Sequence, residues 1–193
     1  MIRDLDNTLE KLLEQELPSE ILADLNITFE TPDMNFPPEY ISLPAIDLFL
    51  YNIQEKQELR SNEWYVERNS NGTAIKKHSP VRVECSYLIT AWVSTSPEGE
   101  KPPKEEHNLL SEVMKVLLRH PTLPAEVLQG SLKDQELPIR TISLQPDSVE
   151  MIGQFWQALG GKVKAVFKYS VIISVDTYKP VKVGVVKKET FEI

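Results

Sequence analysis

The side chains best suited to chemistry in this sequence are three histidines and a single cysteine. His107 follows Glu105-Glu106 near the start of a predicted helix, and His120 lies thirteen residues further on, at its end. Two ligands on one helical face must be three or four residues apart, so this pair cannot hold one metal ion. The sequence therefore predicts no metal site, and we expect these histidines to be surface residues.

The sequence also lacks the residue patterns that are typical of nucleophilic catalysis and of phosphate binding. Cys85 shares the parity of Val83 and Tyr87 in a predicted strand, which favours a buried structural thiol. Gly160-Gly161 follows a predicted helix, whereas a phosphate-binding glycine loop precedes one. We predict no catalytic residue and no cofactor. An enzyme using Glu106, His107 or His120 remains an alternative.

The composition restricts the partners. The chain of 193 residues has a net charge of −8 and a pI near 5.0, which disfavours nucleic acid and anionic membranes. The acidic N-terminal region does not resemble a signal peptide, and no apolar run is long enough to insert into a membrane. A cytoplasmic protein is expected. Residues 177–193 carry a charge of +2, from four Lys and two Glu, which fits head-to-tail contact between copies or a solvated tail.

The element around which the rest must be organised is the strand Pro80–Trp92. Its apolar residues alternate with polar ones from Val81 to Ile89, as on a strand with one buried face. Leu88, Ala91 and Trp92 add apolar side chains at its far end, so that half is expected to be covered on both sides. We place it in the middle of a sheet.

The other elements follow from periodicity and punctuation. Predicted helices are an N-terminal segment that Pro18 stops, Ser19–Leu25 with Ser19 as its cap, Glu105–Arg119, Leu123–Leu128 closed by Gly130, and Val149–Leu159 capped by Asp147 or Ser148. Predicted strands are Leu25–Phe29, Ala45–Ile53, Ile139–Leu144 and Val163–Asp176. In the last strand Val166 is out of parity, so a bulge or burial on both faces is expected. This order predicts a single α+β domain over residues 1–176, a mixed β-sheet packed by helices.

Two appendages are expected to leave this domain. Residues 63–77 read as a protruding hairpin around the sequence NSNG, either an arm that contacts a neighbouring subunit or an insertion without a partner. Trp64 is its candidate interface anchor, and His78 follows in a basic loop. Residues 177–193 are predicted to form an extended C-terminal arm that adds a strand to a neighbour's sheet. Its candidate interface residues are Tyr178, Lys179, Pro180, Val181, Val183 and Val185.

Four stretches, taken in order, resemble one family. They are the amphipathic N-terminal helix, LFLYNI from Leu48, PVRVECSYLITAW with EHNLL, and FWQALGGKVKAVFKYSVIISVD from Phe155. They are similar to the N-terminal domain family of the tail cap, or tail terminator, of contractile injection systems of the antifeeding-prophage and Photorhabdus virulence cassette type. The resemblance covers nearly the whole chain.

That resemblance implies a structural role. Six copies would form a ring that closes the distal end of the inner tube and binds the last layer of sheath. The implied partners are further copies of the chain, the sheath protein and the inner tube protein, with the tape-measure protein as a further one. Assembly into the particle would start in the cytoplasm. Because the sequence ends at Ile193 while many relatives continue, a minimal cap is expected. A phage tail-completion or sheath-associated subunit is the alternative within the same assembly logic.

Overall fold

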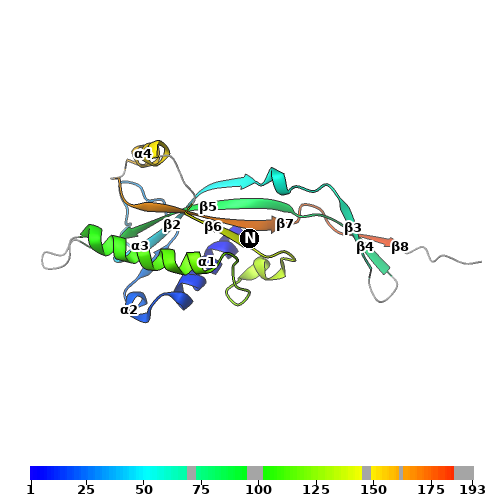
Figure 1. Ribbon diagram of the computed structural model, residues 1–193, viewed down its shortest axis with the longest axis horizontal. Coiled ribbons are helices and arrows are strands. Elements are labelled where there is room, and N and C mark those ends of the chain that lie inside the picture. Colours follow the sequence, from blue (N-terminus) through cyan, green and yellow to red (C-terminus); the bar gives the residue numbers. More distant parts are fainter. Residues whose placement is uncertain (69–72, 95–101, 145–148, 161–162, 185–193) are drawn as a thin grey trace, which may run out of the picture. The chain divides into compact units, whose positions relative to one another are not determined.

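The computed structural model describes residues 1–68, 73–94, 102–144, 149–160 and 163–184 (Figure 1). Contacts between residues divide the chain into two compact units. The first comprises residues 1–53 and 84–173, and the second comprises residues 54–83 and 174–193. The predicted class is confirmed, because helices pack on a sheet that contains both parallel and antiparallel pairs.

The larger sheet has five strands in the order β1-β2-β5-β7-β6. Their bounds are β1 Asn26–Thr28, β2 Ala45–Glu55, β5 Val81–Trp92, β6 Arg140–Ser143 and β7 Val166–Val175. β1 runs parallel to β2, with Asn26 opposite Ala45, whereas β6 runs antiparallel to β7, with Ile142 opposite Ser170. β5 occupies the centre of the sheet, as its apolar pattern predicts.

Two long helices, α1 (Ile2–Glu16) and α3 (Pro102–Arg119), cover one face of this sheet (Figure 1). The short α2 (Ser19–Leu22) lies on the same side. α1 ends before Pro18 as predicted, and its leucines are buried at helical spacing: Leu5, Leu9, Leu12 and Leu13. α2 is shorter than predicted. Ser19 is its first helical residue, after Pro18 as N-cap, and no side chain caps it.

α4 (Val149–Ala158) lies on the opposite face of the sheet (Figure 1). Its Phe155 ring centroid is 5.9 Å from that of Phe49 on β2, and Trp156 is fully buried. Gly160, with φ of 67°, follows the helix in the left-handed conformation that glycine tolerates, as predicted. The predicted caps, Asp147 and Ser148, lie outside the described residues.

The sequence pattern underestimates how deeply the central strands are buried. The polar residues of β5, expected on an outer face, are buried as well: Arg82, Glu84, Ser86 and Thr90. In β7 the five consecutive residues from Tyr169 to Ile173 are buried, so burial on both faces explains its irregular pattern. Side chains on β7 supply polar partners, since the Ser86 and Ser170 hydroxyls lie 2.9 Å apart.

The predicted helix at Leu123–Leu128 is wrong. The segment forms turns, and a 3-10 helix, η2 (Gly130–Asp134), follows it. The chain at the start of this segment runs beside β6 instead, because Leu123 N–H donates to Ile139 O at 2.9 Å, just before β6, and Pro121 O accepts the Thr141 N–H of β6 at 3.0 Å. These bonds occupy the outer edge of β6, which limits pairing there with another chain.

The second unit holds a three-stranded antiparallel sheet in the order β3-β4-β8. Its elements are the 3-10 helix η1 (Gln57–Leu59), β3 (Trp64–Arg68), β4 (Thr73–His78) and β8 (Val181–Gly184). β3 and β4 are the two strands expected of the hairpin, and the turn between them lies outside the described residues. His78 ends β4 rather than lying in a loop, which corrects the prediction from its basic neighbours.

Candidate assembly interface

The residues considered for catalysis do not come together. His107 is exposed on α3, whereas His120 Nε2 lies 3.6 Å from Glu16 Oε2. His78 belongs to the three-stranded sheet. Over the ranges that the structure describes, no group of three or more His, Cys, Asp or Glu side chains could hold a metal ion.

Cys85 is fully buried at the centre of β5, as predicted. Burial raises the pKa of its thiol to about 11, and the nearby charges of Asp6 and Glu84 act in the same direction. A thiol of this kind is protonated at neutral pH and is a poor nucleophile. The burial and the raised pKa of its thiol therefore indicate that Cys85 is a packing residue.

The predicted interface residues that the structure describes belong to the β3-β4-β8 sheet or adjoin it, and two of them stack on one histidine. Trp64 lies directly opposite His78 in the register, with 3.5 Å between ring centroids. The Tyr178 ring centroid is 4.4 Å from that of His78. Lys76 Nζ also lies 4.4 Å from the Trp64 ring centroid, within the range of a cation–π contact.

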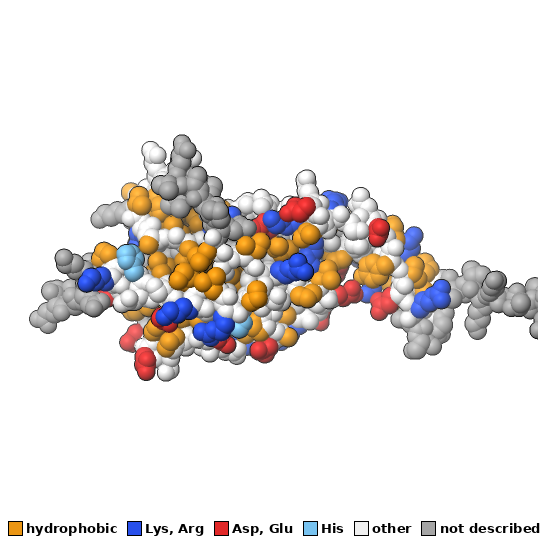
Figure 2. Space-filling view, in the orientation of Figure 1, with side chains coloured by type: hydrophobic (Ala, Val, Ile, Leu, Met, Phe, Trp, Pro, Cys, Tyr) orange, Lys and Arg blue, Asp and Glu red, His pale blue; other side chains and the backbone are white. Residues whose placement is uncertain are grey.

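The register places these side chains on one face of the sheet. Val66 and Val181 both lie opposite Lys76, so they share the side of Trp64 and His78. We call this surface the Trp64 face; its residues are Trp64, Val66, Lys76, His78, Tyr178 and Val181. Figure 2 shows hydrophobic side chains beside Lys and Arg side chains in this region.

The apolar members of the Trp64 face are open to solvent. The exposed fractions are 44% for Trp64, 53% for Val66, 61% for Tyr178 and 52% for Val181. Ala74, opposite Val183, has the parity of Lys76 and is nearly fully buried, so this side of the sheet is covered at that end and open around Trp64 and Val181. Contiguous exposed apolar side chains of this kind mark sites of protein contact.

The opposite side of the small sheet carries an ion pair. Lys77 Nζ lies 2.8 Å from Glu67 Oε2, and both residues have the other parity from Trp64. Such an exposed ion pair contributes about 0.2–1 kcal/mol, so the sheet is not held together by charge alone. The opposite face also carries Tyr65, which is 37% exposed, and Ile75, so the Trp64 face is distinguished by its stacked aromatic rings.

The remaining predicted residues are placed as follows. Val181 and Val183 lie on β8 opposite Lys76 and Ala74 of the same chain, while Lys179 and Pro180 are exposed just before that strand. Val185 lies outside the described residues. β3 and β8 are the edge strands of the sheet, so each has one side available for a further strand.

Three members of this surface were not predicted from the sequence: His78, Lys76 and Val66. The signal was present in TAIKKH, where Ala74, Lys76 and His78 alternate with the other parity. Alternation alone could not show that Tyr178, about one hundred residues from His78, supplies the third ring of the stack.

No helix within the described part of the chain has the length and apolar character needed to cross a membrane.

The architecture is that of an α+β module with an exposed apolar sheet face and no assembled catalytic group among the described residues. Residues 4–185 match the model of the Pvc16 N-terminal domain, and the chain belongs to that family. The resemblance inferred from sequence is thereby confirmed.

Two solved structures share the fold over the whole chain. One is the sheath/tube terminator, in the extended state, of PVC, an extracellular contractile injection system, with a TM-score of 0.71 and 23% identity. The other is the tube-terminating cap of the anti-feeding prophage, with a TM-score of 0.67 and 23% identity. Both alignments cover 100% of this chain, which spans 63% and 62% of the respective matched chains. No curated protein matches the sequence.

Proposed function

We propose that this protein is a terminator of a contractile injection particle, which closes the distal end of the inner tube and binds the last layer of sheath. The observation that carries the proposal is the fold match over 100% of the chain to two terminator proteins. The family match over residues 4–185 supports the same conclusion. The role is structural, and the protein assembles in the cytoplasm before the particle is complete.

In this function six copies of the protein form a ring. A ring needs one surface on each copy that fits a different surface on the next, repeated until it closes. The Trp64 face and the edge strands β3 and β8 suit such a contact. Exposed apolar side chains provide the buried area, and an open edge can accept a strand through main-chain hydrogen bonds.

The segment from Tyr178 to Val185 belongs to the same contact. Within one chain its strand, β8, pairs with β4, which leaves the outer edge of β8 for a neighbouring subunit or for the sheath protein. Lys179 and Pro180 are exposed beside it and contact the same partner. The sheath protein, the inner tube protein and the tape-measure protein are the partners of the assembled ring.

Electron microscopy of particles from a strain that lacks this gene tests the function. We expect tubes of uncontrolled length or particles without stable sheath, and restoration by the full-length protein. Particles of normal length and normal sheath in the deletion strain would overturn the proposal. Labelling the protein at one end of the particle separates a terminator from a sheath-associated subunit along its length.

A further inference from the structure

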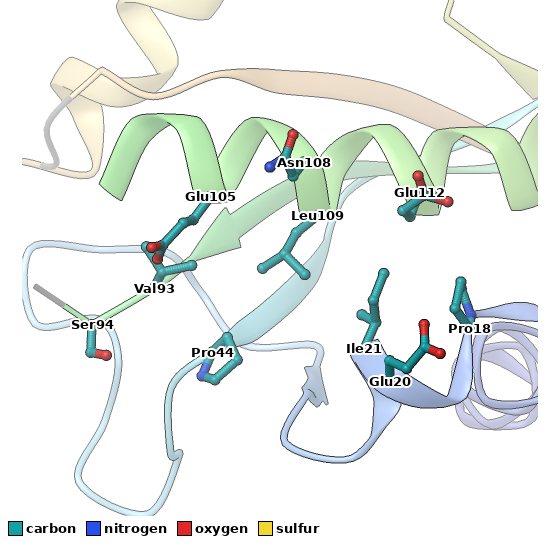
Figure 3. Close-up of a pocket in the computed structure, with 10 residues that line it drawn as sticks. All are labelled: Pro18, Glu20, Ile21, Pro44, Val93, Ser94, Glu105, Asn108, Leu109 and Glu112. Carbon is teal, nitrogen blue, oxygen red and sulfur yellow. The ribbon is translucent and has the colours of Figure 1, made fainter. Parts of the chain in front are cut away.

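A groove in the first unit lies between α2 and α3 and has no role in the fold described above (Figure 3). Its volume is ≈ 580 Å³, within the roughly 300–1,000 Å³ of pockets that hold ligands or side chains. Ile21 from α2 and Leu109 from α3 reach into it, and Pro44 and Val93 border it where strands begin and end. We call it the α2–α3 groove.

The groove is lined by a side of α3 that does not face the core. The core side carries Leu110, Val113 and Leu117, which are all buried. The groove is lined instead by Glu105, Asn108, Leu109 and Glu112, at spacings of three and four residues. α3 therefore has a second ordered stripe, with one apolar residue among polar ones, on the side that borders the groove.

The charge on the groove has one sign. Glu20, Glu105 and Glu112 line it, and its described lining residues include no Lys, Arg or His. Glu112 is paired with Lys115, whose Nζ is 2.5 Å from its Oε1. Glu20 and Glu105 have no ion-pair partner in the described ranges. An apolar floor with unpaired acids at its rim fits a segment that carries apolar side chains next to cations.

The sequence contains one segment of this character beyond the described residues. Lys-Lys occurs at two places, 76–77 and 187–188. In β4 both lysines have partners, since Lys76 lies over Trp64 and Lys77 pairs with Glu67. The second pair follows Val185-Val186 directly and is followed by Glu189, Phe191 and Glu192, so its cations stand beside apolar residues in a segment whose side chains have no net charge.

We propose that the α2–α3 groove of one copy receives residues 185–193 of a neighbouring copy. The apolar side chains of that segment pack on Ile21 and Leu109, and Lys187 and Lys188 lie at Glu20 and Glu105. A groove on one copy and a segment from the next make a head-to-tail contact, which is the type that closes into rings. The inference rests on the proposed assembly of copies and names a contact that joins them.

Peptide binding to the full-length chain tests the groove directly. The receptor carries Lys187→Gln and Lys188→Gln, so that its own segment brings neither cations to the native groove nor new acids to a basic one, and the probe is a labelled peptide VVKKETFEI. We expect saturable binding by fluorescence anisotropy. Adding Glu20→Lys and Glu105→Lys should weaken it at least tenfold, because two attractions become repulsions. The same charge change at Glu126 and Asp134, which are exposed and do not line the groove, should leave the affinity within twofold.

Equal binding to the groove variant and to the Glu126/Asp134 control would overturn the proposal, as would absence of saturation at about 1 mM peptide. A peptide with both lysines changed to glutamate is expected not to bind. Tight binding of that peptide would assign the groove to a different, charge-independent occupant.

Mixing two full-length variants then tests that the contact joins different copies. One variant carries Glu20→Lys and Glu105→Lys, and the other carries Lys187→Glu and Lys188→Glu. Each alone should lack the groove contact, whereas the mixture should contain a heterodimer or larger mixed oligomers that neither variant forms alone, since one variant keeps the native segment, the other keeps the native groove, and the two reversed charge pairs also attract. No heterodimer in the mixture would overturn the contact between copies. Unterminated tubes in the gene-deletion strain together with failed peptide binding would refute this inference and leave the terminator function standing.

Discussion

Asp47 is a buried acid with half of its carboxyl group unsatisfied. It is 0% exposed on β2, opposite Thr28 of β1, and its Oδ1 accepts the Glu30 N–H at 2.9 Å. Its Oδ2 has no hydrogen-bond partner among the described residues. Burial raises the pKa of this carboxyl to about 8, and the charge of Glu30 acts in the same direction. The folded protein therefore holds a neutral acid here at neutral pH.

Asp47→Asn should remove a pH dependence of stability. The unfolded chain ionises Asp47 near pH 4, whereas the folded chain does so only near pH 8. The folded state thus binds more protons between these values, and the free energy of unfolding falls as pH rises from about 4 to about 8. Asn keeps the acceptor for Glu30 and cannot ionise. We expect the variant to be more stable than the parent at pH 8, by on the order of a few kcal/mol.

Urea unfolding at pH 5, 6.5 and 8 measures this effect. The exposed Asp24→Asn variant is the control and should keep the parent's pH dependence. Part of the slope should persist in Asp47→Asn, because burial also raises the pKa of Asp6, which accepts the Tyr87 hydroxyl at 2.8 Å. An unchanged slope in Asp47→Asn would show that the carboxyl is already ionised in the folded protein.

Position 130 requires glycine, because the Asp4 carboxylate lies close to its backbone. The Asp4 carboxylate accepts the Ser131 N–H at 3.1 Å and its hydroxyl at 2.7 Å, and these bonds together with the N-terminal ammonium lower its pKa to about 2. A Cβ on Gly130 would lie 2.4 Å from Asp4 Cγ, and φ there is +50°. Gly130→Ala should therefore lower the free energy of unfolding by about 1–3 kcal/mol. Thermal or urea unfolding measures the loss.

The matched control for Gly130 is another glycine. A Cβ added to Gly153 on α4 would meet nothing within 4 Å, and the backbone there is helical, so Gly153→Ala should stabilise by about 0.5–1 kcal/mol. Opposite signs for the two alanines would confirm that geometry, rather than glycine content, decides the effect. A stabilising Gly130→Ala would mean that Asp4 lies elsewhere.

Among the elements, β5 and β7 are joined by polar side chains within the sheet. Ser86 and Ser170 are both fully buried and share a hydrogen bond of 2.9 Å. Replacing either by alanine leaves one buried hydroxyl without its partner, at a cost of about 1–3 kcal/mol. Replacing both removes the unsatisfied group, so the double variant should lose less than the sum of the two single losses.

A double-mutant cycle by chemical denaturation gives this coupling. Ser111→Ala is a useful reference, because that exposed-side hydroxyl on α3 bonds to the His107 carbonyl of its own helix at 2.7 Å. It should show no coupling with Ser170→Ala. Strict additivity of Ser86→Ala and Ser170→Ala would mean that the two hydroxyls do not depend on each other.

The same two strands show what the sequence could and could not predict. Helices α1 and α3 and strand β5 follow from local periodicity, because each has a continuous apolar face. The burial of Glu84 and Ser86 could not be predicted, since β7, which supplies a partner, lies more than eighty residues away. The failed helix at Leu123–Leu128 has a related cause, since Leu123 N–H bonds to the distant Ile139 O, and Val127 and Leu128 N–H make only turn bonds, to Pro124 O and Ala125 O.

The candidate interface could likewise be predicted from the sequence only in part. Exposure of Trp64 and the strand character of Val181 and Val183 were accessible from composition and alternation. The stack on His78 was not, because it joins three residues from three separate stretches of chain. Aromatic contacts between distant segments depend on the register of the sheet, and register is not encoded in any one strand.

At the level of the whole molecule, residues 177–193 are expected to serve assembly rather than folding. All five strands of the larger sheet end by Val175, so a chain of residues 1–176 keeps that sheet, and β4 loses its partner β8. We expect the truncated protein to unfold cooperatively, with near-native circular dichroism, and to fail to restore tube length in the deletion strain. Co-sedimentation with particles measures its incorporation.

Two full-length variants distinguish a role of the Trp64 face from a role of the segment 177–193. Trp64→Ala removes a ring that is 44% exposed, so it should cost only about 1 kcal/mol of stability while weakening incorporation. Leu59→Ala removes a side chain that is 47% exposed outside that face, and it should incorporate normally. If the truncated protein and Trp64→Ala both assemble as the parent does, this sheet is not the assembly surface. Failure of the truncation alone would assign the contact to the segment after Asp176, because Trp64 and its neighbours on β3 would then be present and insufficient.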